Sequence, residues 1–138
     1  YSGGLVEDDG EFCLTWRDDT VQAIFHVATL IESKDNSIVA RKRHIGNTYV
    51  NIVYSDDEME YKRSTIPGQV NDVHIVVQPR VDGTYRVNIQ KKADVPPFGP
   101  LSGIHILPKC ALAPLVRLTA FNADLACHIS HQARVEVV

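Results

Sequence analysis

The sequence predicts a single α/β domain with a mixed central β-sheet flanked by helices and a long C-terminal helix. Three observations support this: apolar runs with strand spacing recur along the chain, polar or helical segments separate them, and the spacing becomes helical after Pro108. Hydrophobic residues make up 44% and charged residues 22% of the 138 residues, which suffices for a globular core. We therefore expect one domain over residues 1–138.

The first predicted strands occupy residues 11–17 and 22–30. In the first strand apolar residues alternate with other residues, which is typical of a half-buried strand. Its apolar positions are Phe12, Leu14 and Trp16. The second strand is an apolar run that contains His26. We interpret His26 as a core or sheet-face histidine that forms a hydrogen bond, rather than as a catalytic residue.

A short helix is predicted over residues 38–47, with Asp35, Asn36 or Ser37 as its N-cap. At about 100° per residue, Arg43 and His44 share a face with Asn47, and Ile45 lies on the opposite face as an apolar anchor. Gly46 costs about 1 kcal/mol relative to alanine in a helix interior. Its presence indicates the close approach of another backbone or the end of the helix.

Further strands are predicted at residues 49–54, 73–77 and 85–90. Residues 73–77 are almost continuously apolar, as in a strand buried on both faces. Residues 85–90 follow an Asp-Gly turn signal and alternate, as in a strand with one wet face. The acidic segment 55–60 is interpreted as a solvated loop; the alternative is that it faces a partner protein. Residues 64–69 are expected to form a single helical turn.

The C-terminal part begins with a loop over residues 94–103, whose prolines and glycines predict a rigid, irregular path across the surface. Helical spacing starts at about Pro108, and we expect the regular helix to begin near Pro114 because proline fits only the first turn. Five residues fall on one stripe of this helix: Leu115, Leu118, Asn122, Leu125 and Ile129.

Charge and motifs exclude several classes of function. The net charge of −3 gives no overall basic field for nucleic acid, and the basic residues are clustered locally, as at 41–43. The sequence contains neither a phosphate-binding glycine loop nor a nucleophile elbow. It also contains no signal peptide, and no apolar run of the roughly 18 residues that a membrane span needs.

The cysteines predict reduced thiols in the cytosol. Cys13, Cys110 and Cys127 are odd in number and lack metal-type spacing. A metal site that joins Cys127, His128 and His131 is the alternative, but zinc usually requires four well-spaced ligands. We therefore expect an exposed helix end here and no metal.

The segment Arg41-Lys42-Arg43-His44-Ile45-Gly46-Asn47 resembles the catalytic helix of the Rap, Ral and tuberin group of GTPase-activating proteins. The residues alone would also allow a solvated surface helix ending in a Gly-Asn cap, or a local nucleic-acid patch. The further matches spaced as in the tuberin branch are Tyr1–Leu5, Asp9-Gly10, Trp16, Asp18-Asp19, Gln22-Ala23 and Phe25–Leu30. The loop at 94–100 is more similar to the Rap and Ral branches.

The resemblance implies a GTPase activator rather than an enzyme in its own right. In this family an asparagine thumb enters the nucleotide site of the GTPase and orients the attacking water, which assigns Asn47 as the catalytic residue. His44 would fix the thumb or lie against the partner, and Arg43, Lys42 and Gly46 would bind the GTPase. The chain itself would need no cofactor, because GTP and Mg²⁺ belong to the partner. Thr48 stands where the family usually has Asp.

The resemblance also suggests partners. The tuberin branch implies Rheb as the GTPase, negative regulation of TOR signalling, and hamartin as a partner of the full-length protein. The alternatives are a Ral- or Rap-directed activator and a catalytically weakened GTPase-binding module. We expect a cytoplasmic location with recruitment to the lysosomal or vacuolar membrane surface. Because the chain starts at Tyr1 without a methionine, we expect a fragment of a larger protein.

Overall fold

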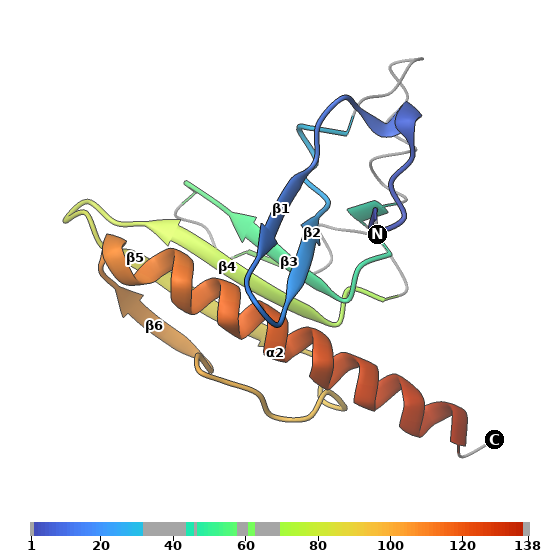
Figure 1. Ribbon diagram of the computed structural model, residues 1–138. Coiled ribbons are helices and arrows are strands. Elements are labelled where there is room, and N and C mark those ends of the chain that lie inside the picture. Colours follow the sequence, from blue (N-terminus) through green and yellow to red (C-terminus); the bar gives the residue numbers. More distant parts are fainter. Residues whose placement is uncertain (1, 32–43, 46, 58–60, 63–69, 137–138) are drawn as a thin grey trace. The chain divides into compact units, whose positions relative to one another are not determined.

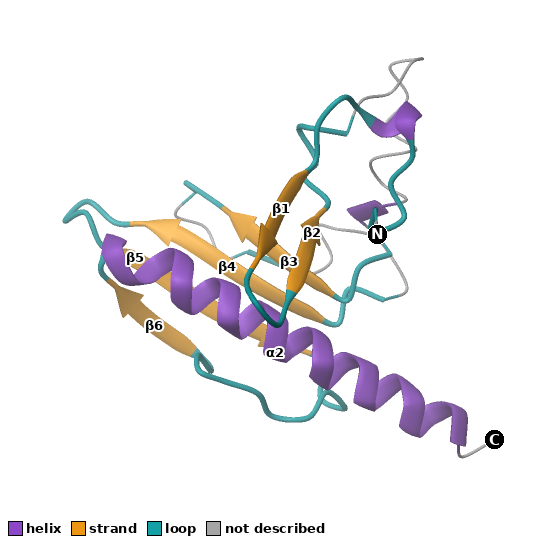
Figure 2. Ribbon diagram, viewed as in Figure 1, coloured by secondary structure: helices purple, strands orange, loops and turns teal. Residues whose placement is uncertain are grey.

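The computed structural model describes residues 2–31, 44–45, 47–57, 61–62 and 70–136 (Figure 1). The chain forms two compact units, Tyr1–Asn47 with Pro67–Gln69 and Thr48–Ile66 with Val70–Val138. The predicted α/β class is confirmed: the chain folds with a mixed β-sheet and a long C-terminal helix (Figure 2).

The first unit contains a short 3-10 helix, η1 (Glu7–Asp9), and a two-stranded antiparallel sheet of β1 (Leu14–Arg17) and β2 (Gln22–Phe25). Trp16 pairs with Ala23 in this sheet. Asp18 closes the turn between the strands, because its Oδ1 accepts hydrogen bonds from the backbone of Thr20 and Val21, each at 2.7 Å. These bonds lower the pKa of Asp18.

Both strands of this unit are shorter than predicted. Phe12 lies outside β1 and is 71% exposed, and Leu14 within it is 53% exposed, so the alternation did not mark a buried face. Beyond Phe25 the chain leaves the sheet, because the backbone N–H groups of Leu30 and Ile31 both donate to the carbonyl of Val27. A turn thus takes the donors that a longer strand would have used.

The second unit is built on a sheet in the order β3-β4-β5-β6. Its strands are β3 (Val50–Tyr54), β4 (Val73–Pro79), β5 (Tyr85–Lys91) and β6 (Ile104–Leu107). The β3–β4 pair is parallel and the other pairs are antiparallel. β4 is buried on both faces as predicted, since Val73 through Val77 are all at most 5% exposed. β6 is a strand that the sequence analysis did not predict.

Helix α2 (Lys109–Glu136) lies along one face of this sheet (Figure 1). It contacts β3 and β4, and its residues form a core with Val73, Ile75 and Val87. Val95 and Leu101 add to this core, so the loop at 94–103 is irregular as predicted but does not merely cross the surface. By length and composition α2 could cross a membrane, yet its inner face is buried here against the sheet.

Two predictions about α2 are wrong. The helix begins at Lys109 and includes Pro114 in its interior. Proline has no backbone N–H to donate, so the helix tolerates the loss of one hydrogen bond there. The predicted stripe also faces outward in part: Leu118, Leu125 and Ile129 are 49%, 62% and 58% exposed. The buried face instead carries small residues, which let the helix approach the sheet closely. They are Thr119, Ala120, Ala123, Ala126, Cys127 and Ser130.

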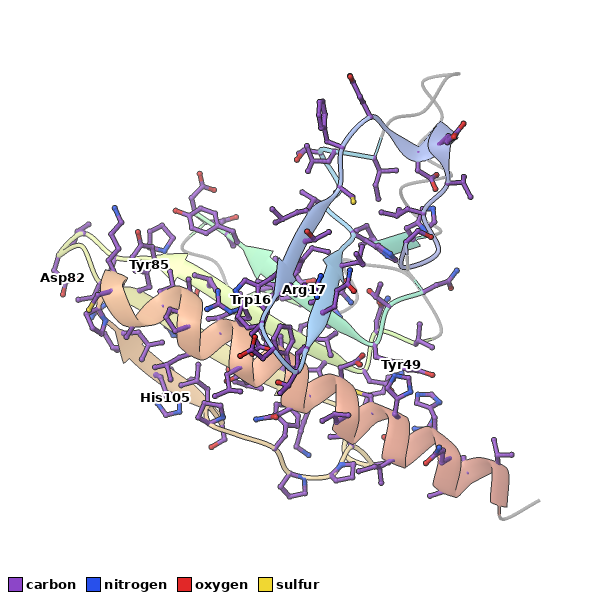
Figure 3. The ribbon with its side chains drawn as sticks, viewed as in Figure 1. Trp16, Arg17, Tyr49, Asp82, Tyr85 and His105 are labelled. Carbon is purple, nitrogen blue, oxygen red and sulfur yellow. The ribbon has the colours of Figure 1, made fainter. Side chains whose placement is uncertain are left out.

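A buried carboxylate fastens α2 to the sheet. Asp72 is fully buried, and it accepts hydrogen bonds from Nζ of Lys92 at 2.9 Å and from Nε2 of His131 at 2.7 Å. His131 stacks on Tyr49, just before β3, with ring centroids 4.6 Å apart, and Figure 3 shows Tyr49 beside the C-terminal half of α2. Burial alone would raise the pKa of Asp72, but the bonds and positive charges of Lys92 and His131 outweigh it and lower this pKa.

We expect Asp72→Asn to lower the free energy of unfolding by about 2 kcal/mol at pH 7, since it weakens a buried pair whose lysine is partly hydrated. The folded-state pKa of Asp72 lies below its unfolded value, so the charged carboxylate stabilises the fold at neutral pH. That contribution is lost as the pH falls below about 4. Urea unfolding from pH 7 to pH 3 measures it.

The exposed Asp56 provides the control for this prediction. Asp56→Asn should leave the free energy of unfolding within about 0.5 kcal/mol of wild type across the same range. A difference between wild type and Asp72→Asn that stays constant from pH 7 to pH 3 would contradict a stabilising role for the charge.

Candidate functional site

Asn47 is exposed to solvent in a turn of the first unit. It follows His44 and Ile45, which are helical, so these described residues agree with a predicted helix that ends near Asn47. The remainder of that helix, its N-cap candidates, and the site residues Lys42, Arg43 and Gly46 lie outside the described residues. An exposed carboxamide can accept and donate hydrogen bonds at once, without bringing a net charge.

His44 lies inward, in contrast to Asn47. Its side chain is 9% exposed, and its Nε2 lies 2.9 Å from Oδ2 of Asp9, which is itself only 6% exposed. The same Oδ2 accepts the backbone N–H of Val6 at 2.9 Å, and the N–H of Asp9 donates back to the carbonyl of Val6. Of the two roles predicted for His44, fixing the thumb and lying against the partner, its burial favours the first.

His26 is the second imidazole of this site. Its ring centroid lies 5.2 Å from that of His44, with the ring planes at 68°. Its Nε2 lies 2.7 Å from the carbonyl oxygen of Gly3, which agrees with the predicted hydrogen-bonded histidine. Gly3 is required here, because its φ is +64° and a Cβ atom would come within 2.9 Å of the Ile24 side chain.

Asp9 and His26 are not among the site residues predicted from the sequence. Asp9 appears there only among the matches to the tuberin branch, and His26 only as a structural histidine. Their contacts join residues far apart in the chain: Asp9 and His44 are separated by 35 positions. No local pattern encodes such a pairing, and only the buried position of both partners in the fold identifies it.

The C-terminal residues considered for a metal have other partners in this structure. His131 bonds to Asp72, and His128 lies 3.4 Å from Asp124. Burial, with the nearby carboxylates, raises the pKa of the Cys127 thiol to about 12. Within the described ranges, no group of three or more histidine, cysteine or acidic side chains could hold a metal ion. Cys13, Cys110 and Cys127 form no disulfide bonds with one another.

Thr48, which follows Asn47 and opens the second unit, is held by its neighbours there. Its carbonyl accepts the backbone N–H of Asn71 at 3.0 Å, and its hydroxyl donates to Oδ1 of Asn51 at 3.2 Å. Asn51 in turn donates to Asn71 at 2.9 Å. The Thr48 hydroxyl thus has a hydrogen-bond partner within the second unit.

Fold and site together define an α/β domain that presents an amide side chain beside a buried histidine. A model of the Rap/ran-GAP family matches residues 1–137. The Ral GTPase-activating protein subunit alpha-1 of Homo sapiens is 38% identical over 129 residues, which cover 91% of this chain and 6% of that protein. The tuberous sclerosis 2 protein homolog of Schizosaccharomyces pombe is 31% identical over 153 residues, covering 100% of this chain and 11% of that protein. The chain belongs to the Rap/ran-GAP family.

A solved structure agrees with this assignment. The structure of the TSC2 GAP domain matches with a TM-score of 0.80 and 29% sequence identity, over 96% of this chain and 74% of that chain. The family resemblance that the motifs predicted is therefore confirmed. The relatives named above are much longer than this chain, which spans only 6% and 11% of their length.

Proposed function

We propose that this chain stimulates GTP hydrolysis by a Ras-family small GTPase, and that Asn47 is the group it supplies. The observation that carries the proposal is the exposed Asn47 one turn after a buried, tethered His44. Phosphoryl transfer depends mainly on positioning an in-line water and on electrostatic stabilisation. A carboxamide suits the first task because it can accept from the water while donating toward phosphate.

The amide also avoids a cost that a charged group would bring. Moving a carboxylate or ammonium group into a partner's closed nucleotide site requires its desolvation, whereas a hydrogen-bonded amide enters at a much smaller cost. In this proposal Arg43, Lys42 and Gly46 contact the GTPase, and GTP and Mg²⁺ are bound by the partner. The chain is thus an activator that supplies a catalytic residue in trans.

We propose Rheb as the GTPase, with negative regulation of TOR signalling as the consequence. The likeness to the TSC2 GAP domain and to the S. pombe tuberous sclerosis 2 homolog supports this choice. The full-length protein would then act with hamartin in the cytoplasm and be recruited to the lysosomal or vacuolar membrane surface.

A Ral-directed activator is the second candidate. The 38% identity to the human Ral GTPase-activating protein subunit favours it, as does the Pro96–Pro100 loop. A third possibility, a module that binds the GTPase without activating it, would follow if Thr48 weakens the thumb.

Single-turnover hydrolysis on GTP-loaded Rheb, Ral and Rap distinguishes these candidates. We expect acceleration of about 10³-fold or more for Rheb at saturating chain, and less for the others. Acceleration of GTP hydrolysis by Ral or Rap but not by Rheb would mean that the chain is a GTPase activator for that other GTPase. Binding to the GTP-loaded forms without acceleration would identify a binding module, and no binding to any of the three would refute the proposal.

A further inference from the structure

A set of contacts connects His44, three positions before Asn47, to the N-terminal part of the chain; Asp9 and His44 are buried, and His26 is half-buried. We call Gly3, Asp9, His26 and His44 the histidine cluster. Its bonds connect the N-terminal segment, η1, the residue after β2 and the helical His44, all within the first unit. The proposed function uses neither Asp9 nor His26, and their contacts with His44 raise the question of what they do.

The hydrogen-bond partners of His26 and His44 determine which ring nitrogen of each histidine carries a proton. A carbonyl oxygen can only accept, so Nε2 of His26 carries the proton that bonds to Gly3. Nδ1 of His26 is buried, and no group in the described part of the chain forms a hydrogen bond with it. A lone pair is tolerated there far better than an N–H that would be left without an acceptor. His26 is therefore the Nε2–H tautomer.

The proton on His44 is fixed in a similar way. Its Nε2 faces a carboxylate oxygen of Asp9, which accepts and cannot donate when ionised. The backbone N–H of Val6 bonds to that same oxygen, so the acceptor is itself held in place. The edge of one imidazole against the other limits rotation of the His44 ring.

We propose that Asp9 and His26 are positioning residues, which hold His44 and thereby set the direction of Asn47. The inference rests on the proposed function of Asn47. Asn47 follows His44 by only three positions in the chain, so a displacement of the His44 backbone is passed on to Asn47. Groups that orient a reacting water must be held within about 0.5 Å, and a misplacement of about 1 Å can cost 10²-fold in rate. Loss of the cluster should therefore reduce the maximal stimulated rate more than the affinity.

Matched variants separate the hydrogen bonds from the packing. Asp9→Asn keeps an acceptor for both Val6 and His44, whereas Asp9→Leu removes it. His26→Gln keeps a donor near Gly3, whereas His26→Phe keeps only the ring. Thermal unfolding of each variant by circular dichroism establishes that it folds.

For the GTPase that the chain stimulates, we expect Asp9→Asn and His26→Gln to remain within about threefold of the wild-type maximal rate. Asp9→Leu and His26→Phe should lose about 10²-fold, while the chain concentration that gives half the effect changes less than threefold. Folded Leu and Phe variants with the wild-type rate would overturn the inference, as would a loss confined to affinity. If those two variants do not fold, a 10²-fold loss in Asp9→Asn or His26→Gln would overturn it, since both keep the proposed bonds.

A spectroscopic measurement tests the inference without any GTPase. In the chain with ¹⁵N-labelled histidine, both His26 and His44 should carry a proton on Nε2, and the Asn47 amide resonances should shift in His26→Phe but not in His26→Gln. A proton on Nδ1 alone in either ring would overturn the geometry. If wild type stimulates no GTPase while these signals appear as expected, the proposed function fails and the positioning of Asn47 stands.

Discussion

Asn47→Ala is expected to leave the chain folded and to reduce its stimulation of GTP hydrolysis by about 10³-fold or more. The side chain is exposed, so its removal opens no cavity and leaves no buried polar group unpaired. In the proposed function, the lost amide is the group that aligns the water and donates toward phosphate. Single-turnover hydrolysis at saturating chain measures the loss, and the unfolding midpoint by circular dichroism should change little.

Two controls accompany this variant. Asn88→Ala removes a half-buried asparagine from β5 in the second unit and should keep at least half of the stimulated rate. Asn47→Asp keeps the size but replaces the donor with a charge, so it should fail like alanine. An Asn47→Ala chain that stimulates within a few-fold of wild type would exclude Asn47 as the catalytic group.

His44→Phe has the second largest expected effect, a loss of about 10²-fold in the maximal stimulated rate. Phenylalanine preserves the volume of the ring but cannot donate to Asp9. The buried carboxylate then keeps its bond from Val6 but loses the one from His44. We expect the free energy of unfolding to fall by about 1–3 kcal/mol, and urea titration measures it alongside the hydrolysis assay.

His44→Gln is the matched variant, because its amide nitrogen can reach the position of the imidazole Nε2. It should recover most of the rate that phenylalanine loses. Equal losses in His44→Gln and His44→Phe would mean that the imidazole itself, rather than its bond to Asp9, is what the activity needs.

The sheet of the second unit was predictable from local patterns. β4 is a continuous apolar run, and β5 alternates after an Asp-Gly turn; either signal identifies a strand by itself. β6 was not predictable in this way, because its four residues follow an irregular loop and its pairing with β5 is not encoded locally. The face of α2 was misjudged because both its large and its small apolar residues recur at helical spacing, and only packing decides between them.

The site likewise contains residues that a local motif identifies and residues that only the fold brings together. Asn47 and His44 lie together in one short motif, so the sequence alone is enough to propose them as site residues. Asp9 and His26 were missed because they reach His44 through the fold. Lys42, Arg43 and Gly46 lie outside the described residues, and their contacts with a GTPase stay predictions.

The inward position of His44 has a consequence for how members of this family can diverge. A side chain that contributes almost nothing to the outer surface takes no part in choosing a partner. Residues that face a partner can then change while the Asp9–His44 contact is retained. Selectivity and catalysis can evolve separately in such an arrangement.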